Sequence, residues 1–444
     1  MLSKSQVFTL GLQHVLAMYA GAVVVPILIG SSLKFSSSQM TYLIAADLFT
    51  CGIATLLQVI GNRFIGIKLP VVLGATFTAV SPIIAIGKTT NIGTIFGSII
   101  IAGIAVFLLA PLFGMVLKLF PTVVTGSVVT IIGLTLIPVA MGNAAGGQGS
   151  PSFGAPHNLI LALGTLLIIL VMNRYLRGFL RAISILMGLI LGTLAGALLG
   201  IVKFSPVLKA SWFNIVHPFY FGQPHFNLIA IITMIIVGIV SMVESTGVYF
   251  ALSQIVEKPI GQKDIVKGLR AEGIAIVLGG IFNTFPYTTF SQNVGLVSLT
   301  RVKTRNVIVA AGGILVALGL LPKVAALTTV IPDAVLGGAM IAMFGMVVAY
   351  GANILSQVNF NDNNNLLVVA CSIGVGLGSA TMPQMFAHLP NMLQMLLQNG
   401  IVTGSVTAVA LNLFLNGWGA TEAASEGTAD PETHNRSSSV TAGV

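Results

Sequence analysis

A short polar stretch interrupts the apolar second half of the sequence. Residues 285–301 read FPYTTFSQNVGLVSLTR, which includes Ser291, Gln292 and Asn293 as well as Pro286. Proline interrupts a regular helix, and hydroxyl and amide side chains can both donate and accept hydrogen bonds. At membrane depth, such side chains and irregular backbone are stable only where protein or a water-filled cavity receives them. The stretch therefore predicts a binding site enclosed by the protein.

Buried acids are the second group of residues that could do chemistry. A carboxylate near the centre of a bilayer costs at least about 2.5 kcal/mol, so such residues usually mark a ligand or proton path. Of the eleven acidic residues, Asp47, Glu244 and Glu272 lie inside apolar runs. Glu244, in SMVESTGVYF, has serine, threonine and glycine beside it. We predict Glu244 to be a site residue; the alternative is a structural carboxylate that caps a backbone defect.

For four polar residues, a structural interpretation competes with a functional one. Glu272 follows Arg270 near the start of an apolar run, so an interfacial ion pair is the alternative to a functional role. Asp47 is the weaker candidate and is expected near the outer surface. His14 either hydrogen-bonds a neighbouring segment as a neutral imidazole or only packs against it. Asp333 is predicted to be structural, as a first-turn acid that favours a helix N-terminus.

Enzymatic and metal chemistry are not indicated by the sequence. No cluster of His, Cys or acidic residues has the spacing of a metal site, and no phosphate-binding loop is present. We therefore expect no cofactor and no ATP-driven step. Because no nucleophile is paired with a base, we do not expect an enzyme.

The composition is that of a membrane protein. The chain has 444 residues, of which 55% are hydrophobic and 7% are charged, and its mean hydropathy is +0.99. A soluble domain of this size does not have such a composition. The net charge of +9 comes from basic residues in short loops, where they indicate orientation and not a nucleic-acid partner. The sequence predicts an all-α polytopic protein in contact with lipid.

A run of about 20 apolar residues is long enough to cross a bilayer. Most basic residues fall in the loops on the side of the N-terminus, which predicts that both termini are cytoplasmic. After residue 418 the composition becomes polar, and residues 419–444 are predicted to be a disordered cytoplasmic tail. The fourteen predicted segments are residues 7–30, 39–60, 69–86, 92–118, 121–141, 158–173, 181–202, 227–255, 267–283, 286–299, 306–322, 333–352, 364–381 and 396–418.

The segments contain an internal repeat. PTVVTG begins the fifth segment at Pro121, and PDAVLG begins the twelfth at Pro332. The third and tenth segments are both short, begin with an apolar residue and a proline, and become polar within seven residues. Since seven is odd, the two copies have opposite orientations, an arrangement typical of secondary transporters. The alternative is a chance match in a glycine-rich apolar chain.

QNVGLVSLTR, residues 292–301, resembles the signature of the nucleobase-ascorbate transporter family, also called the second group of nucleobase:cation symporters. The resemblance extends to QHVLAMYAG, LPVVLGATF, VESTGVYFA and IPDAVLGGAM, and so to most of the chain. It implies two inverted repeats of seven segments, with short antiparallel strands in the third and tenth. It also implies a homodimer in which a core slides against a gate. The implied core is residues 1–120 and 205–331, and the implied gate is residues 121–204 and 332–418.

The resemblance also implies a site between the two strands. Glu244 and Gln292 are the expected main ligands, and Phe77 closes the pocket. Asn293 orients the site, and proton coupling is expected from Glu244 and Glu272, with His14 as a further candidate. The substrate-binding residues carried over by motif are Thr76, Phe77, Glu244, Ser291, Gln292 and Asn293.

The expected substrate is an oxidised purine. Gln292 stands where uracil-selective members of the family tend to have glutamate, which favours a purine. One carbonyl and one amide group in Gln292, with the acceptors of Glu244, match the alternating donors and acceptors of xanthine or uric acid. The resemblance implies import by proton symport across the plasma membrane. The sequence does not distinguish xanthine from uric acid. A symporter for uracil or another nucleobase, and an uncoupled facilitator, remain alternatives.

Overall fold

The structure is a computed structural model that describes residues 3–202, 204–300 and 302–417, without the side chains of residues 292, 299, 391, 392 and 395. The predicted disordered tail, residues 419–444, lies outside the described residues.

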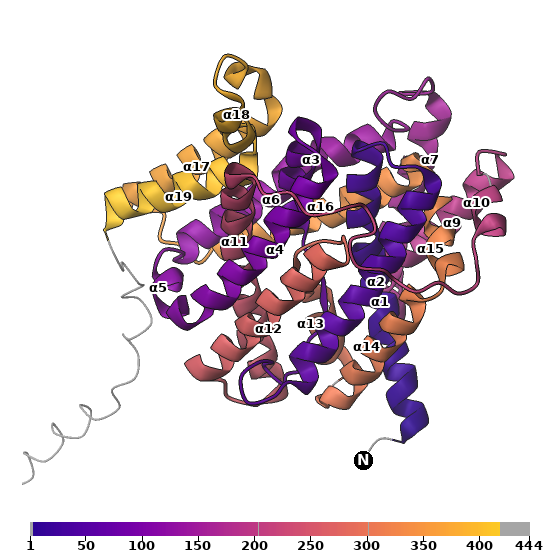
Figure 1. The fold of residues 1–444 in the computed structure, drawn as a ribbon, viewed down its shortest axis with the longest axis horizontal. Coiled ribbons are helices and arrows are strands. Elements are labelled where there is room, and N and C mark those ends of the chain that lie inside the picture. Colours follow the sequence, from indigo (N-terminus) through magenta and orange to yellow (C-terminus); the bar gives the residue numbers. More distant parts are fainter. Residues whose placement is uncertain (1–2, 203, 301, 418–444) are drawn as a thin grey trace, which may run out of the picture.

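Most of the described chain is helical (Figure 1). In the first half the helices are α1 (Lys4–Ser32), α2 (Ser37–Ile60), α3 (Val80–Thr89), α4 (Ile92–Leu109), α5 (Phe113–Lys118), α6 (Thr122–Ala144), α7 (Pro156–Tyr175), α8 (Phe179–Ala182) and α9 (Ser184–Leu198). In the second half they are α10 (Ser205–Lys209), α11 (Leu228–Val256), α12 (Gln262–Ile281), α13 (Ser291–Thr300), α14 (Arg305–Gly319), α15 (Pro322–Thr329), α16 (Asp333–Leu355), α17 (Asn363–Thr381), α18 (Asn391–Leu397) and α19 (Gly400–Asn416).

The helices identify a multi-pass membrane protein. Within the described ranges, eight helices are long and apolar enough to cross a membrane, namely α1, α2, α4 with α5, α6, α7, α11, α16 and α17. Helices α14 and α15 qualify together but bend by 79° at the break between them. Helices α9 and α19 are apolar but shorter. The count of fourteen crossings and the boundaries of core and gate stay predictions.

Local sequence signals explain several helix starts. The Ser36 hydroxyl accepts a hydrogen bond from the Gln39 amide, and the Gln39 side chain accepts one from the Ser36 amide. This reciprocal capping satisfies amide groups that have no partner within the first turn. Helix α16 begins at Asp333 directly after Pro332, as predicted for a first-turn acid.

Two three-residue strands connect the halves of the chain. Strand β1 (Leu73–Ala75) lies within predicted segment 69–86, and strand β2 (Tyr287–Thr289) within segment 286–299. They pair antiparallel, with Gly74 opposite Thr288. Flanking backbone hydrogen bonds extend the pairing, from the Thr76 amide to the Pro286 carbonyl at 2.9 Å and from the Phe290 amide to the Val72 carbonyl at 3.0 Å. Each extended segment thus supplies the backbone partners that the other needs.

Helix packing repeats between the two halves. Helix α4 packs against α11 and α12, and α14 packs against α1 and α2. Each helix of the first set lies seven predicted segments from its counterpart in the second set, so the two sets of pairs are equivalent. In the same way, α7 packs against α9 and α16, and α17 packs against α19 and α6, while α6 and α16 pack against each other. Figure 1 shows α17 beside α19 at the upper left.

The packing defines two helix groups. The strand group contains α1, α2, α4, α11, α12 and α14 around the two strands. The flanking group contains α6, α7, α9, α16, α17 and α19. The strand group and the flanking group are defined by helix packing alone.

Glycines allow close helix crossings in the strand group. A Cβ atom added at Gly52 of α2 would lie 2.7 Å from the Gly312 carbonyl oxygen of α14. At the corresponding crossing of α4 and α12, a Cβ at Gly273 would lie 2.9 Å from the Gly103 carbonyl oxygen. Since backbone atoms occupy these positions, neither crossing can accept a side chain without moving a helix.

This packing generates a stability prediction. Gly52→Ala should destabilise the protein by about 1 to 3 kcal/mol, because the methyl group meets backbone atoms of α14. Gly313→Ala is the matched control, since a Cβ at that α14 position has nothing within 4 Å. It should leave stability unchanged or raise it by up to about 1 kcal/mol. Thermal unfolding of the detergent-solubilised variants measures both, and equal midpoints would contradict the crossing.

Candidate functional site

Strand β2 is attached to α11 through Ser245. The Ser245 hydroxyl lies 2.9 Å from the Thr288 hydroxyl, and it accepts hydrogen bonds from the Thr289 amide and hydroxyl, both at 3.3 Å. All three side chains are buried. Since Glu244 precedes Ser245 directly, this attachment also fixes the position of the Glu244 backbone relative to the strand.

Glu272 belongs to a buried hydrogen-bond chain. The Tyr249 hydroxyl of α11 donates to Glu272 Oε2 at 3.5 Å, and the Gln58 amide of α2 donates to the Tyr249 hydroxyl. Gln58 also donates to the Gly268 carbonyl at 3.1 Å. Glu272 is 0% exposed, and no described residue forms a hydrogen bond with its Oε1 atom. The chain therefore connects three helices of the strand group and leaves one carboxyl oxygen open.

The alternative of an ion pair between Glu272 and Arg270 is wrong. These positions are two apart along α12, and side chains at that spacing do not face each other on a helix. The Arg270 guanidinium instead lies over the Phe107 ring, 5.6 Å from its centroid. The two ion pairs of the described residues are Lys267 with Asp264 and Lys303 with Glu257. Neither includes an acid that lies inside an apolar run.

Asn293 and His14 hold α13 against α1. The Asn293 side-chain amide lies 3.1 Å from His14 Nδ1 and donates to the His14 carbonyl at 3.1 Å. Asn293 Oδ1 is buried without a protein partner. Of the two interpretations of His14, a hydrogen bond to another segment is therefore confirmed.

Glu244 lies where the two helix groups meet. Its Oε2 atom is buried and has no hydrogen-bond partner among the described residues. A cavity of 20 Å³ beside it is bounded by Val240 and Val243 of α11 and by Thr125, Val128, Val129 and Ile132 of α6. Such a space holds about one water molecule. A carboxyl oxygen without a partner is available to accept a hydrogen bond from a ligand.

The other predicted residues surround the ends of the strands. Phe77 follows β1 in the short helix η1 (Phe77–Ala79), and its ring packs edge-on against Phe344 of α16 at 5.5 Å between centroids. The Thr76 hydroxyl accepts from the Thr78 amide at 3.2 Å. Ser291 follows β2 and is exposed. The Gln292 backbone belongs to α13, but its side chain lies outside the described part of the chain, so its role stays a prediction.

Asp47, the weaker candidate of the sequence, is enclosed and hydrogen-bonded in the structure. Its side chain is 1% exposed, and its Oδ1 atom accepts a hydrogen bond from the Tyr287 hydroxyl of β2 at 2.9 Å. An acid within an apolar run was the available signal, but the sequence does not show which side chain meets it.

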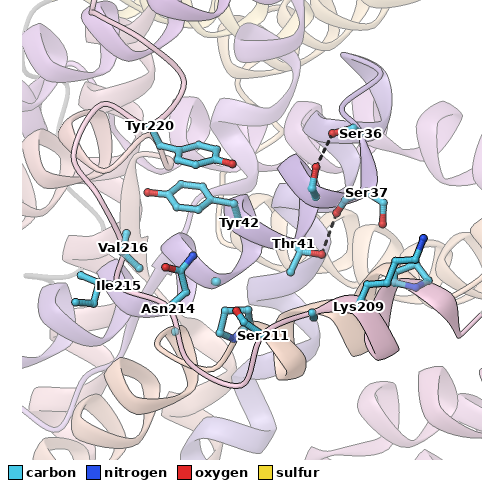
Figure 2. A pocket seen from close by; sticks show the side chains of 16 residues that line it. Ser36, Ser37, Thr41, Tyr42, Lys209, Ser211, Asn214, Ile215, Val216 and Tyr220 are labelled. Carbon is cyan, nitrogen blue, oxygen red and sulfur yellow. Dashed lines mark hydrogen bonds between the residues drawn. The ribbon is translucent and has the colours of Figure 1, made fainter.

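Figure 2 shows a second, larger cavity of 520 Å³ at the N-terminal end of α2. Its lining includes Ser36, Lys209 and Asn214, and Tyr42 stacks on Tyr220 at its edge with 3.6 Å between ring centroids. The Tyr42 hydroxyl also donates to the His217 carbonyl at 2.7 Å, which attaches the loop before α11 to α2. None of the predicted substrate-binding residues lines this cavity.

The arrangement of long apolar helices is that of a multi-pass membrane protein. In fold, the chain is similar to the transmembrane domain of the bicarbonate transporter BicA of a cyanobacterium, with a TM-score of 0.64 and 15% identity, covering 92% of this chain and 98% of that one. At this identity the similarity concerns the fold alone.

Sequence comparison identifies the family. The profile of a permease family matches residues 5–385. The xanthine permease of Bacillus subtilis is 56% identical over 408 residues, which cover 92% of this chain and 93% of that protein. The uric acid permease PucK of the same organism is 56% identical over 409 residues, covering 92% and 95%. The chain belongs to this permease family, the nucleobase-ascorbate transporters, and is a transporter and not an enzyme.

The Ser245 contacts generate a second prediction. Ser245→Ala should lower stability by about 1 to 3 kcal/mol, because the hydroxyls of Thr288 and Thr289 lose a buried partner. Thr246→Val is the control, since the Thr246 hydroxyl is equally buried but bonds only the Met242 carbonyl of its own helix. Thermal unfolding midpoints compare the two, and an equal loss in both variants would show that the strand attachment contributes nothing of its own.

Proposed function

We propose that this protein imports an oxidised purine, xanthine or uric acid or both, by proton symport across the plasma membrane. The observation that carries the proposal is the Glu244 carboxyl oxygen, which is buried at the boundary of the two helix groups without a hydrogen-bond partner among the described residues. Two relatives that are both 56% identical to this chain are named a xanthine permease and a uric acid permease. These names support an oxidised purine as the substrate but do not decide between xanthine and uric acid.

The chemistry of the site suits a planar heterocycle. Glu244 can accept hydrogen bonds from ring N–H groups, and Gln292 can pair one carbonyl and one amide with a neighbouring edge of the ring. The Phe77 side chain, which already packs edge-on against Phe344, supplies an aromatic surface. A purine that lacks one of the matching groups would leave a buried partner unpaired, at a cost of about 1 to 3 kcal/mol. Adenine should therefore bind poorly.

The proposed transport cycle is elevator-like, with the strand group as the core and the flanking group as the gate. Since the space beside Glu244 is only 20 Å³, a purine cannot enter until the strand group and α6 separate. Movement of one group against the other would provide that space. Both termini are proposed to be cytoplasmic, as the distribution of basic residues predicts, and the protein is proposed to be a homodimer, as the resemblance to the family implies.

Proton coupling is assigned to the buried acids. Gln292 cannot titrate, which leaves Glu244 and Glu272, with His14 as a further candidate. Glu244 would bind substrate, while Glu272, with its open Oε1 atom, would hold or release the proton.

Uptake of radiolabelled xanthine and urate, in cells that lack other purine transporters, tests the function. Glu244→Gln should weaken the apparent affinity at least about tenfold, since a charged hydrogen-bond acceptor is lost. Glu257→Gln is the control, because Glu257 is an exposed acid paired with Lys303. Uracil, guanine and hypoxanthine serve as competitors. Absence of purine uptake, or stronger competition by uracil than by either purine, would reject the substrate assignment.

The proton role of Glu272 is tested by pH dependence. In the wild type, uptake should rise as the external pH falls, and a proton uncoupler should abolish accumulation. Glu272→Gln should flatten this dependence while exchange of bound purine continues. Tyr249→Phe is the control, since it removes the hydroxyl bonded to Glu272 and keeps the carboxyl. An unchanged pH dependence in Glu272→Gln would remove Glu272 from the role, and accumulation that survives the uncoupler would indicate an uncoupled facilitator.

A further inference from the structure

One buried acid has no part in the proposed transport cycle. Asp47 lies in the middle of α2 and is 1% exposed. Its Oδ1 atom accepts a hydrogen bond from the Tyr287 hydroxyl at 2.9 Å. The Cys51 thiol donates a weak hydrogen bond to its other oxygen, with Sγ 3.9 Å from Oδ2. Burial of a carboxyl without full pairing is costly, so an acid in this environment is expected to have a specific role.

Tyr287 is the first residue of β2, and it is 0% exposed. Its hydroxyl lies between Asp47 and the Thr284 hydroxyl, which is 2.8 Å away. The Thr284 hydroxyl also donates to the Gly279 carbonyl of α12 at 3.3 Å, so the Tyr287 hydroxyl lies between Asp47 and a residue that is itself bonded to α12. The carboxyl thus fixes the position of the ring.

Helix α2 contacts both strands. Eight residues after Asp47, the Thr55 hydroxyl accepts a hydrogen bond from the Leu73 amide of β1 at 3.0 Å. Asp47 makes the equivalent attachment to β2 through Tyr287. Helix α2 is itself fixed at the close Gly52 crossing with α14. A rigid helix therefore holds the first residue of each strand.

The position of β2 sets the position of the substrate contacts. Ser291 and Gln292 lie two and three residues after Thr289, the last residue of the strand. A shift at Tyr287 moves these residues relative to Glu244, which is on a different helix. Displacements of about 1 Å in a binding site are enough to lower function strongly.

We propose that Asp47 is a positioning residue, which orients strand β2 and the substrate contacts after it through the Tyr287 hydroxyl. This inference rests on the proposed function, because it assigns the residues after β2 to purine binding. It concerns the hydrogen bond between two side chains and assigns no proton transfer to Asp47.

Transport kinetics test the effect on the substrate site. Asp47→Leu and Tyr287→Phe should each raise the KM for xanthine or urate about tenfold, the effect of one hydrogen bond to a charged group, with a smaller change in maximal rate. Asp47→Asn, which keeps an acceptor for the tyrosine, should retain most of the wild-type affinity. The double variant should be no worse than the more affected single variant, because both changes break one interaction. Thr50→Val is the control, since this buried hydroxyl bonds only the Ala46 carbonyl of its own helix.

Hydrogen–deuterium exchange of residues 285–291 tests the positioning without substrate. Exchange should accelerate in Asp47→Leu and Tyr287→Phe, and should stay at the wild-type rate in Thr50→Val and Asp47→Asn. Wild-type exchange and wild-type KM in Tyr287→Phe would overturn the proposal. If the wild-type protein transports no purine, the proposed function fails, while the exchange rates still decide whether Asp47 orients the strand.

Discussion

The pairing of β1 with β2 is the interaction on which the rest of the structure depends. Backbone N–H and C=O groups that leave a helix inside a membrane protein need partners, and these two strands supply them for each other. The strands come from opposite halves of the chain, so their pairing joins the two repeats at one place. The predicted contacts at Phe77 and Ser291 follow the strands closely. Whatever holds the strand pair therefore holds the site.

Hydroxyl groups, and not cations, hold two of the three acids near the strands. Asp47 is bonded to Tyr287 and Glu272 to Tyr249 through one oxygen each, while Glu244 and Glu272 each keep an oxygen without a partner among the described residues. A hydroxyl can donate to a carboxylate or accept from a carboxylic acid, so it serves both protonation states. A cation would favour the ionised state alone. The arrangement separates Glu244, which a ligand can complete, from two acids that the protein already contacts.

Composition was enough to predict a multi-pass protein, and the resemblance to the family implied which segments contain the strands. They were not enough to predict the side-chain contacts. Tyr287 and Asp47 are 240 positions apart in the chain, so only the folded arrangement of α2 and β2 brings them together. The Arg270 alternative failed for a local reason, since closeness in sequence does not place two side chains on one helix face. The side chain of Gln292 stays a matter of sequence inference.

The distribution of close packing indicates where movement is possible. Within the strand group, glycine crossings bring backbones into contact, as at Gly52 and Gly273, and hydrogen bonds connect α2, α11, α12 and both strands. Displacement inside this group would break several buried interactions together. At the boundary with the flanking group, Glu244 faces apolar side chains of α6, and Phe77 meets Phe344 through an edge-on ring contact. Apolar contacts of this kind are non-directional and can be exchanged for similar ones. In the proposed transport cycle, the strand group and its site would therefore move as a unit against α6 and α16.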